Sequence, residues 1–312
     1  MINETFTFKS KDNIDIFVYK WLPETHIKGV VQIAHGVCEH AGRYDYFAQK
    51  LTEQGYVVFA NDHRGHGKTA KTYENLIYLG ENGWNRMVAD TYHLTRIIKK
   101  LHPGMPVFFF GHSMGSFVLR QYLYEYPNRI NGAILSGSGH YDPLILNAGI
   151  LIASRLIERD GSKRRSFYLN KMVFENFNEK VSDPETLFDW LSRDKNAIKK
   201  YLADPKCGIP CTNNLFYELL SGLKELQKAK NIVKIPKNTP ILLISGDKDP
   251  VGHWGKDISI LLQLYKKNGI KDVKALLFKE ARHELINEQN RDQIILRIIT
   301  WINSHNFSAS KT

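Results

Sequence analysis

Hydrophobic positions follow two patterns along most of the chain. Near the N-terminus, apolar and polar side chains alternate over residues 5–8 and 14–19, which predicts an antiparallel β-hairpin. Further on, short runs rich in Val, Ile, Leu and Phe indicate strands buried on both faces, and amphipathic stretches between them indicate helices. The expected buried strands are Gly29–Ala34, Tyr56–Ala60, Pro106–Phe110, Ile130–Leu135, Pro240–Ser245 and Val273–Phe278. The expected helices are Arg43–Gln54, Met87–Leu101, Ser116–Glu125, Asp257–Lys267 and Asp292–Trp301.

This alternation of strand and helix predicts an α/β fold with a mostly parallel, doubly wound sheet. The rhythm breaks over residues 141–237, which are rich in helix formers, aromatics and charge and contain no clear buried strand. We expect residues 1–140 and 238–312 to form the α/β core domain. We expect residues 141–237 to be an inserted helical cap, or lid, over the carboxyl edge of the sheet, where ligands bind in open α/β folds. A separate helical domain is the alternative, but no Gly-, Ser- or Pro-rich linker isolates the segment.

The stretch Gly111-His112-Ser113-Met114-Gly115 lies between an expected strand and an expected helix. G-x-S-x-G in that context is the nucleophile elbow, a sharp turn that presents a serine hydroxyl above the sheet. The backbone N–H of Met114 would then lie at a helix N-terminus, where it can stabilise a developing oxyanion. We therefore take Ser113 as the candidate nucleophile.

A serine nucleophile needs a base and an orienting acid, which follow it in the chain order Ser, Asp or Glu, His. Among the late histidines, His305 is expected in the tail beyond the last helix, and His253 leaves little room for a preceding acid. His283 follows the last strand and precedes the last helix, so we take it as the base. Asp247 and Asp249 both follow the strand near residue 244, and we favour Asp249 because it lies further into the loop.

The loop from His35 to His40 follows an early strand, where a second oxyanion donor is expected. Gly36 allows close approach of the backbone, and the N–H of Val37 is the candidate donor. A metal site made of His35, Cys38 and His40 is the alternative, but residues this close on an irregular loop rarely converge on one ion. No metal or organic cofactor is expected. The stretch 62–67, DHRGHG, is interpreted as a polar turn with hydrogen-bonded histidines.

Taken together, four motifs resemble those of the monoacylglycerol lipase and lysophospholipase family of α/β-hydrolases, over nearly the whole chain. They are HGVCEH with GRY (residues 35–40 and 42–44), DHRGHG (62–67), GHSMG (111–115) and ARHE (281–284). The resemblance implies an α/β-hydrolase fold with an inserted cap and an acid at Asp249, where the family pattern G-x-x-D falls. It also places Val37 and Met114 at the oxyanion-hole positions. Residues 188–194, FDWLSRD, resemble the cap of bacterial members named lysophospholipases.

Composition narrows the cellular setting. No apolar stretch of membrane-spanning length and no basic, apolar leader is apparent, so neither segment is expected. Three cysteines, odd in number and sparse, indicate a reducing cytoplasm and ordinary thiols. The net charge of +11 includes the cluster Lys163-Arg164-Arg165, which either favours peripheral association with anionic lipid or is a solvated surface. A nucleic-acid partner is not expected, because no nucleic-acid motif or concentrated basic stripe is present.

The expected activity is hydrolysis of carboxylic esters of monoacyl lipids, monoacylglycerol or lysophospholipid, through an acyl-enzyme on Ser113. The cap should supply an apolar tunnel for the acyl chain. Candidate lining residues are Leu144, Ile145, Ile150, Leu151, Phe174, Phe177, Leu187, Phe188, Trp190 and Phe216. The alternatives are a carboxylesterase or thioesterase acting on short soluble acyl substrates, a peptidase of the iminopeptidase type, and a catalytically silent binding module. The sequence leaves the acyl chain, the leaving group and the oligomeric state open.

Overall fold

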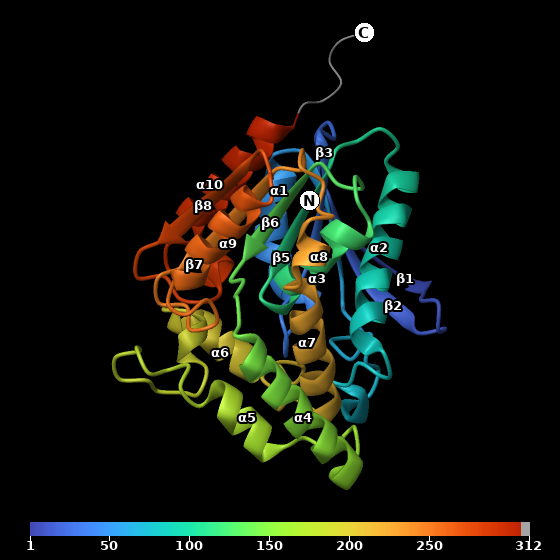
Figure 1. Ribbon diagram of the computed structural model, residues 1–312. Coiled ribbons are helices and arrows are strands. Elements are labelled where there is room, and N and C mark those ends of the chain that lie inside the picture. Colours follow the sequence, from blue (N-terminus) through green and yellow to red (C-terminus); the bar gives the residue numbers. More distant parts are fainter. Residues whose placement is uncertain (307–312) are drawn as a thin grey trace.

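The computed structural model describes residues 1–306, which form one eight-stranded sheet with helices on both faces (Figure 1). The strands are β1 (Ile2–Lys9), β2 (Asp15–Leu22), β3 (Gly29–Ala34), β4 (Tyr56–Asn61), β5 (Val107–His112), β6 (Gly132–Ser136), β7 (Ile241–Gly246) and β8 (Val273–Phe278). The core helices are α1 (Asp45–Glu53), α2 (Gly83–Leu101), α3 (Met114–Glu125), α9 (Lys256–Lys267) and α10 (Arg291–His305). Between β6 and β7 lie α4 (Pro143–Asp160), α5 (Phe167–Phe174), α6 (Lys195–Ala203), α7 (Asn213–Leu226) and α8 (Ala229–Ile232). The short 3₁₀ turns are η1 (Ala41–Tyr44), η2 (Tyr73–Asn75), η3 (Asp189–Leu191) and η4 (Leu285–Asn287).

The strand order is β1-β2-β4-β3-β5-β6-β7-β8. β1 pairs antiparallel with β2, and β2 antiparallel with β4, whereas all pairs from β4 to β8 are parallel. The predicted N-terminal hairpin and mostly parallel sheet are therefore confirmed. After β3 the chain adds β4 on one side and β5 on the other, so the order reverses between β3 and β5. Open α/β sheets bind ligands at the carboxyl ends of the strands at such a reversal.

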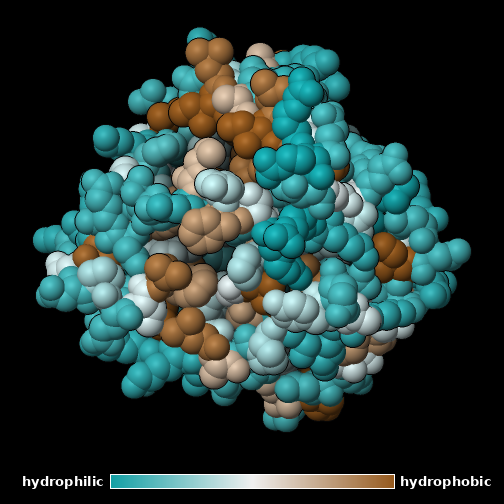
Figure 2. All heavy atoms as spheres, turned by 90° about the horizontal axis from the view of Figure 1, so that it is seen from below, coloured by the Kyte–Doolittle hydropathy of each residue, from teal (hydrophilic) through white to brown (hydrophobic). Residues whose placement is uncertain are grey.

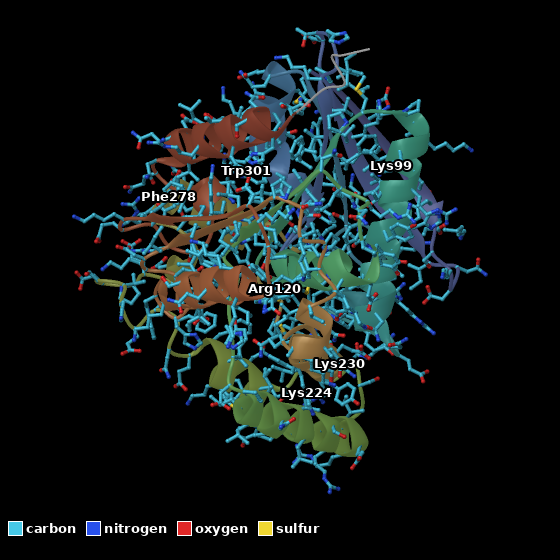
Figure 3. All side chains as sticks on the ribbon, turned by 45° about the horizontal axis from the view of Figure 1, so that its top comes forward. Lys99, Arg120, Lys224, Lys230, Phe278 and Trp301 are labelled. Carbon is cyan, nitrogen blue, oxygen red and sulfur yellow. The ribbon has the colours of Figure 1, made fainter. Side chains whose placement is uncertain are left out.

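Helices cover the two faces of the sheet with separate apolar layers. α1 and α10 pack on one face, while α2, α3 and α9 pack on the other. On the first face, Trp301 of α10 lies against Phe108 of β5, with the ring centroids 6.3 Å apart, and Phe278 lies at the β8 edge (Figure 3). The central strands β3 to β7 are buried along their whole length, as their apolar runs predict.

Most predicted elements are found within a few residues of their expected bounds, with one error that concerns a site candidate. α10 continues past Trp301 to His305, so the prediction that His305 lies in a tail beyond the last helix is wrong. The polar residues at the end of the helix hid its last turn from the hydrophobic pattern. The His305 ring is held there by Asp272, with Nε2 and Oδ2 2.8 Å apart. Asp272 directly precedes β8, whereas Ser113 directly follows β5, so the two lie at opposite ends of the parallel strands.

The segment between β6 and β7 is helical and lies beyond the lower edge of the sheet in the view of Figure 1. Its α7 joins it to the core, because a Cβ on Gly222 would fall 2.2 Å from the Trp84 ring of α2. This close approach needs a glycine. Among the described residues, none of the helices combines the length and apolarity needed to cross a membrane.

Candidate active site

Ser113 lies at the turn between β5 and α3, at the carboxyl edge of the sheet. Its backbone has φ 51° and ψ −121°, a strained conformation for a residue with a side chain. The turn is tight: a Cβ on Gly115 would fall 2.1 Å from the Ala34 carbonyl oxygen, and one on Gly111 would fall 2.4 Å from the Gly115 carbonyl oxygen. Only glycine fits at these two positions. The serine is 8% exposed, and its side chain lines a cavity.

The side chains of His283 and Asp249 are paired next to the same cavity, which His283 lines. The His283 Nδ1 and the Asp249 Oδ1 are 2.9 Å apart, and both side chains are buried. The backbone N–H of Val251 donates to the same carboxylate oxygen at 2.9 Å, which orients the carboxylate. The alternative candidates His253 and Asp247 do not take part in this pair. His253 is paired with Asp257, and Oδ1 of Asp247 has no hydrogen-bond partner among the described residues.

Opposing effects act on the pKa of His283. Burial is the largest single effect and lowers it, but the carboxylate of Asp249, which also accepts the Nδ1 hydrogen bond, acts together with Glu284 and Glu39 to leave the pKa above its usual range. The hydrogen bond to Asp249 fixes the tautomer with the proton on Nδ1, so a neutral ring offers its Nε2 lone pair to the cavity. A ring held in this way can accept a proton from a hydroxyl.

The loop after β3 passes directly over the serine. A Cβ on Gly36 would lie 3.2 Å from the Ser113 Cβ, so the absence of a side chain lets the loop approach. Gly36 and Val37 line the cavity together with Ser113 and His283. Met114 is the first residue of α3, so its N–H is one of the free donors at that helix N-terminus. The structure therefore brings the His283–Asp249 pair, the loop of Val37 and the N-terminus of α3 together around Ser113.

A cavity of about 550 Å³ extends from Ser113 into the helices between β6 and β7. Its walls are mainly apolar and aromatic, from residues Phe167, Phe174, Leu187, Phe188, Trp190, Leu191, Tyr201 and Ile209. Phe167 and Leu187 are also 74% and 82% exposed, so they lie at the opening to solvent. The Trp190 ring lies over His283, with centroids 5.1 Å apart, and its carbonyl accepts the His283 N–H at 3.3 Å.

Four of the ten predicted lining residues, Phe174, Leu187, Phe188 and Trp190, line this cavity. The others do not. Phe216 is buried in the core of the helical segment, and Phe177 packs against Trp190 from outside the cavity. The α4 residues Leu144, Ile145 and Leu151 face solvent with 77%, 69% and 59% exposure. Apolar character alone did not distinguish the inner from the outer face of the helices.

A buried ion-pair cluster next to the cavity was not predicted. Arg43 bridges Glu39, from the loop that carries Val37, and Glu284, the residue after His283. The signal was present in the sequence, because Glu39 and Arg43 are four residues apart and Glu284 adjoins the expected base. No role was assigned to their charges.

The suspected metal ligands separate in the structure. The His35 Nδ1 lies 2.7 Å from the Gly36 carbonyl oxygen, the Cys38 Sγ lies 3.4 Å from Cys211 Sγ, and the His40 Nε2 lies 2.8 Å from Asp204 Oδ2. His40, Asp204 and Cys207 do gather closely enough to hold an ion. However, the Gly42 N–H donates to His40 Nδ1, so the proton resides on Nε2 and is donated to Asp204. That tautomer does not offer Nε2 to a metal.

The interpretation of the DHRGHG stretch is confirmed for His66, whose Nδ1 lies 3.0 Å from a backbone carbonyl oxygen, but it is wrong for His63. The Asp62 carboxylate does brace the turn, since it accepts from the N–H groups of Ala41 and Lys68. Yet neither ring nitrogen of His63 has a hydrogen-bond partner among the described residues. His63 is packed against His35 instead, with ring centroids 4.3 Å apart, and burial lowers its pKa to about 3, so the ring stays neutral. Close packing rather than hydrogen bonding accommodates this ring.

Comparison with known proteins shows which family this chain belongs to. Residues 25–290 match the Hydrolase_4 family model, described as serine aminopeptidase, S33. The chain is 29% identical to a monoacylglycerol lipase of Mycolicibacterium smegmatis, with 96% of each chain covered. It is 28% identical to the monoglyceride lipase of Rattus norvegicus, covering 95% of this chain and 88% of the relative. A thermostable carboxyl esterase from Bacillus coagulans, solved in complex with glycerol, superimposes with a TM-score of 0.90 at 29% identity, covering 98% and 99% of the two chains.

These matches extend over almost the whole chain, and they confirm the α/β-hydrolase fold predicted from the sequence. They include both lipases and an esterase, so they agree on ester-cleaving relatives while differing in the substrate that each name states. The chain therefore belongs to the Hydrolase_4 family, and it is similar to monoglyceride lipases along nearly its whole length.

Proposed function

We propose that this chain hydrolyses carboxylic esters of monoacyl lipids, either monoacylglycerols or lysophospholipids, with Ser113, His283 and Asp249 as its catalytic triad. The observation that carries the proposal is the apolar cavity of about 550 Å³ that Ser113 and His283 both line. A cavity of this size is typical of small-molecule sites. Its apolar walls suit an acyl chain, and the elbow supplies a nucleophile at its base.

In the proposed mechanism, His283 Nε2 removes the proton of the Ser113 hydroxyl as the oxygen attacks the ester carbonyl. The N–H groups of Val37 and Met114 stabilise the negative oxygen of the tetrahedral intermediate. His283 then protonates the departing alcohol, which leaves an acyl-enzyme on Ser113. Water, deprotonated by the same ring, releases the fatty acid, while Asp249 keeps the imidazole in the required tautomer throughout.

Residues 141–237 are proposed to act as a cap domain on a core of residues 1–140 and 238–312. Two backbone hydrogen bonds join the cap to the base's loop, from His283 N–H to the Trp190 carbonyl and from Glu284 N–H to the Leu191 carbonyl at 2.7 Å. The cap supplies most of the cavity wall. Through these two hydrogen bonds it also holds the loop that carries the base. Substrate choice would then depend on cap residues more than on the core.

The outer face of the cap is proposed to rest on a lipid surface. Figure 2 shows this face, where hydrophobic residues gather around a hollow. The exposed apolar residues come from α4, α5 and the loop near the opening: Leu144, Ile145, Leu151, Phe167, Tyr168, Met172 and Leu187. Contiguous exposed apolar residues mark interaction surfaces. A substrate leaving the bilayer would meet the opening of the cavity directly.

The basic cluster of residues 163–165 contributes less to this surface than its charge suggested. The Arg165 guanidinium donates to the carbonyls of Pro210, Tyr73 and Leu76, and Lys163 Nζ donates to Asn75. The contacts with residues 73–76 fasten the cap to the core. The apolar residues of α4 are therefore the better target for a binding test.

Vesicle sedimentation tests the lipid-surface proposal. The double change Leu144→Asp and Leu151→Asp should reduce binding to phosphatidylglycerol vesicles at least fivefold without changing the hydrolysis of p-nitrophenyl acetate. Leu296→Asp, at an equally exposed position on α10, is the matched control and should bind like the parent. Equal binding by all three proteins would remove the proposed surface.

A second candidate is a carboxylesterase that acts on short soluble esters, which the likeness to the Bacillus coagulans carboxyl esterase favours. A thioesterase on short acyl substrates is a related alternative. The family description also names a serine aminopeptidase, so an aminoacyl amide is included among the test substrates. A catalytically silent binding module would turn over none of these substrates.

The deciding experiment measures hydrolysis of monoacylglycerols, lysophosphatidylcholine, an aminoacyl-p-nitroanilide and p-nitrophenyl esters of two to sixteen carbons. The proposal predicts the highest kcat/KM for long-chain monoacyl lipids. Activity confined to short esters would replace it with the carboxylesterase assignment, and activity confined to the anilide would replace it with a peptidase.

A further inference from the structure

The ion-pair cluster formed by Glu39, Arg43 and Glu284 joins two distant parts of the chain. Arg43 Nη1 lies 2.6 Å from Glu39 Oε2 and 2.6 Å from Glu284 Oε1, and Nη2 lies 2.6 Å from Glu284 Oε2. The three side chains are almost completely buried, with exposures of 12% for arginine and 4% and 5% for the carboxylates. A bidentate arginine–carboxylate pair fixes geometry as well as charge. The cluster therefore sets the distance between the segments that carry it.

Glu39 connects the cluster to the loop of the proposed oxyanion donor. Its Oε1 accepts the Gly36 N–H at 2.5 Å and the Tyr44 hydroxyl at 2.9 Å. The next N–H along the chain after Gly36 belongs to Val37. Glu39 holds the Gly36 N–H, and Gly36 is packed against Ser113. The next peptide, which carries the Val37 N–H, therefore has little freedom to turn.

Glu284 connects the cluster to the proposed base, because it directly follows His283. Its backbone N–H donates to the Leu191 carbonyl at 2.7 Å, and its Oε2 also accepts from Asn287 Nδ2 at 2.9 Å. Side chain and backbone are thus both held. Any shift of Arg43 would move this residue and with it the imidazole.

Arg43 also touches the cap. Its guanidinium carbon lies 4.7 Å from the centre of the Tyr201 ring, on α6, and the Tyr201 hydroxyl donates to the Cys38 carbonyl at 3.0 Å. One guanidinium therefore contacts the oxyanion loop, the base's loop and the cap.

We propose that Arg43 is a positioning residue, which holds the Val37 N–H and the His283 imidazole in register around Ser113 through Glu39 and Glu284. This inference rests on the proposed triad mechanism. A purely stabilising role explains the geometry less well, because buried ion pairs contribute little net stability once desolvation is counted. The cost of burying three charges is offset by pre-organised geometry at a site where misplacement by 1 Å slows the reaction strongly.

The test compares Arg43→Lys with Arg64→Lys. Lysine keeps the charge but cannot bridge two carboxylates in fork geometry. Arg64 is the matched control: it is 2% exposed and pairs with both Asp90 and Asp12, but these carboxylates do not line the cavity, whereas Glu39 and Glu284 do. Active serines are counted by complete reaction with diethyl p-nitrophenyl phosphate, and kcat and KM for p-nitrophenyl acetate are expressed per counted serine. Thermal unfolding is recorded for each variant.

The proposal predicts that Arg43→Lys lowers kcat per counted serine at least tenfold with KM within twofold, because the lost alignment matters mainly in the transition state. Arg64→Lys should keep kcat within twofold even where its melting temperature falls as far. Glu39→Gln, which preserves size and an acceptor oxygen for Gly36, should lower kcat three- to tenfold and decides the matter if Arg43→Lys does not fold.

The proposal is overturned if Arg43→Lys or, should that variant not fold, Glu39→Gln, keeps the parent's kcat per counted serine. It is also overturned if Arg64→Lys loses as much kcat as Arg43→Lys. Ser113→Ala is run beside them: if it retains the parent's activity, the triad mechanism itself has failed. If Ser113→Ala is inactive while the Arg43 and Glu39 variants are unaffected, only the positioning role has failed.

Discussion

At the scale of single residues, the site depends on how neighbours set the protonation of one imidazole. The charged groups facing His283 are Asp249, Glu284 and Glu39, and the nearby ring of His112 is kept neutral because burial lowers its pKa far below the usual value. Burial also opposes charge on His283, but the three carboxylates together outweigh it, so the His283 pKa is raised. As a general base the ring must be neutral, so activity should be lost as the pH falls through this raised pKa.

Changing Asp249 to Asn should move the His283 pKa to a lower value. The substitution removes the opposite charge but leaves the burial, which favours the neutral ring. The rate at pH 8 should fall by about 10⁴, since the tautomer is no longer enforced. Titration of the His283 ring by ¹⁵N NMR in parent and variant measures the shift independently of the rate. An unchanged or raised pKa in the variant would contradict the role given to Asp249.

At the scale of elements, the tight turn from β5 to α3 positions Ser113, the proposed nucleophile. The two glycines of the turn let β5, α3 and the end of β3 approach one another more closely than any side chain allows. The strained Ser113 backbone is held by its own N–H, which donates to the Ser136 carbonyl at 2.8 Å. Strand, turn and helix therefore act together, and no one of them could place the hydroxyl alone.

Gly115→Ala should destabilise the protein by about 3 kcal/mol, at the upper end of typical overpacking costs. The new methyl group would meet the backbone carbonyl of Ala34, which cannot move without shifting β3. Gly104→Ala is the control: unlike Gly115 it has a positive φ, at 75°, but the space around it is open, so only about 1 kcal/mol of backbone strain is expected. Urea unfolding measures both. Equal costs would show that the turn is less tightly packed than described.

The cap segment should set acyl-chain length. Ile209, in the loop between α6 and α7, is buried and lines the cavity, so Ile209→Trp should fill part of the space for the chain. Hydrolysis of p-nitrophenyl palmitate should fall at least tenfold, while p-nitrophenyl acetate should be cleaved within twofold of the parent rate. Leu296→Trp on the exposed face of α10 controls for the added ring. A parallel loss on both esters would place the acyl chain elsewhere.

At the scale of the whole molecule, local patterns predicted the sheet and the sites attached to it. Each core strand is a short apolar run, and Ser113, Asp249 and His283 each follow the end of such a run. Residue order was therefore enough to place them near one another. The resemblance to a known family added Asp249 over Asp247, a choice that the His283 contact supports.

What the sequence could not predict depends on which faces pack together. Leu144 and Phe174 are both apolar residues of predicted helices, yet one faces solvent and the other lines the cavity. The pairing of Arg43 with Glu284 joins residues 241 positions apart, so no local pattern contains it. Such features follow from the docking of the cap on the core and from the approach of two loops, which only the structure provides.

The most direct test of the account compares the parent protein with Ser113→Ala on a long-chain monoacylglycerol, such as monooleoylglycerol, at pH 8. The account predicts that release of fatty acid by the variant falls at least about 10⁴-fold, as when a triad nucleophile is removed, while its melting temperature stays near that of the parent. Release of fatty acid by Ser113→Ala at a rate within tenfold of the parent would contradict the account.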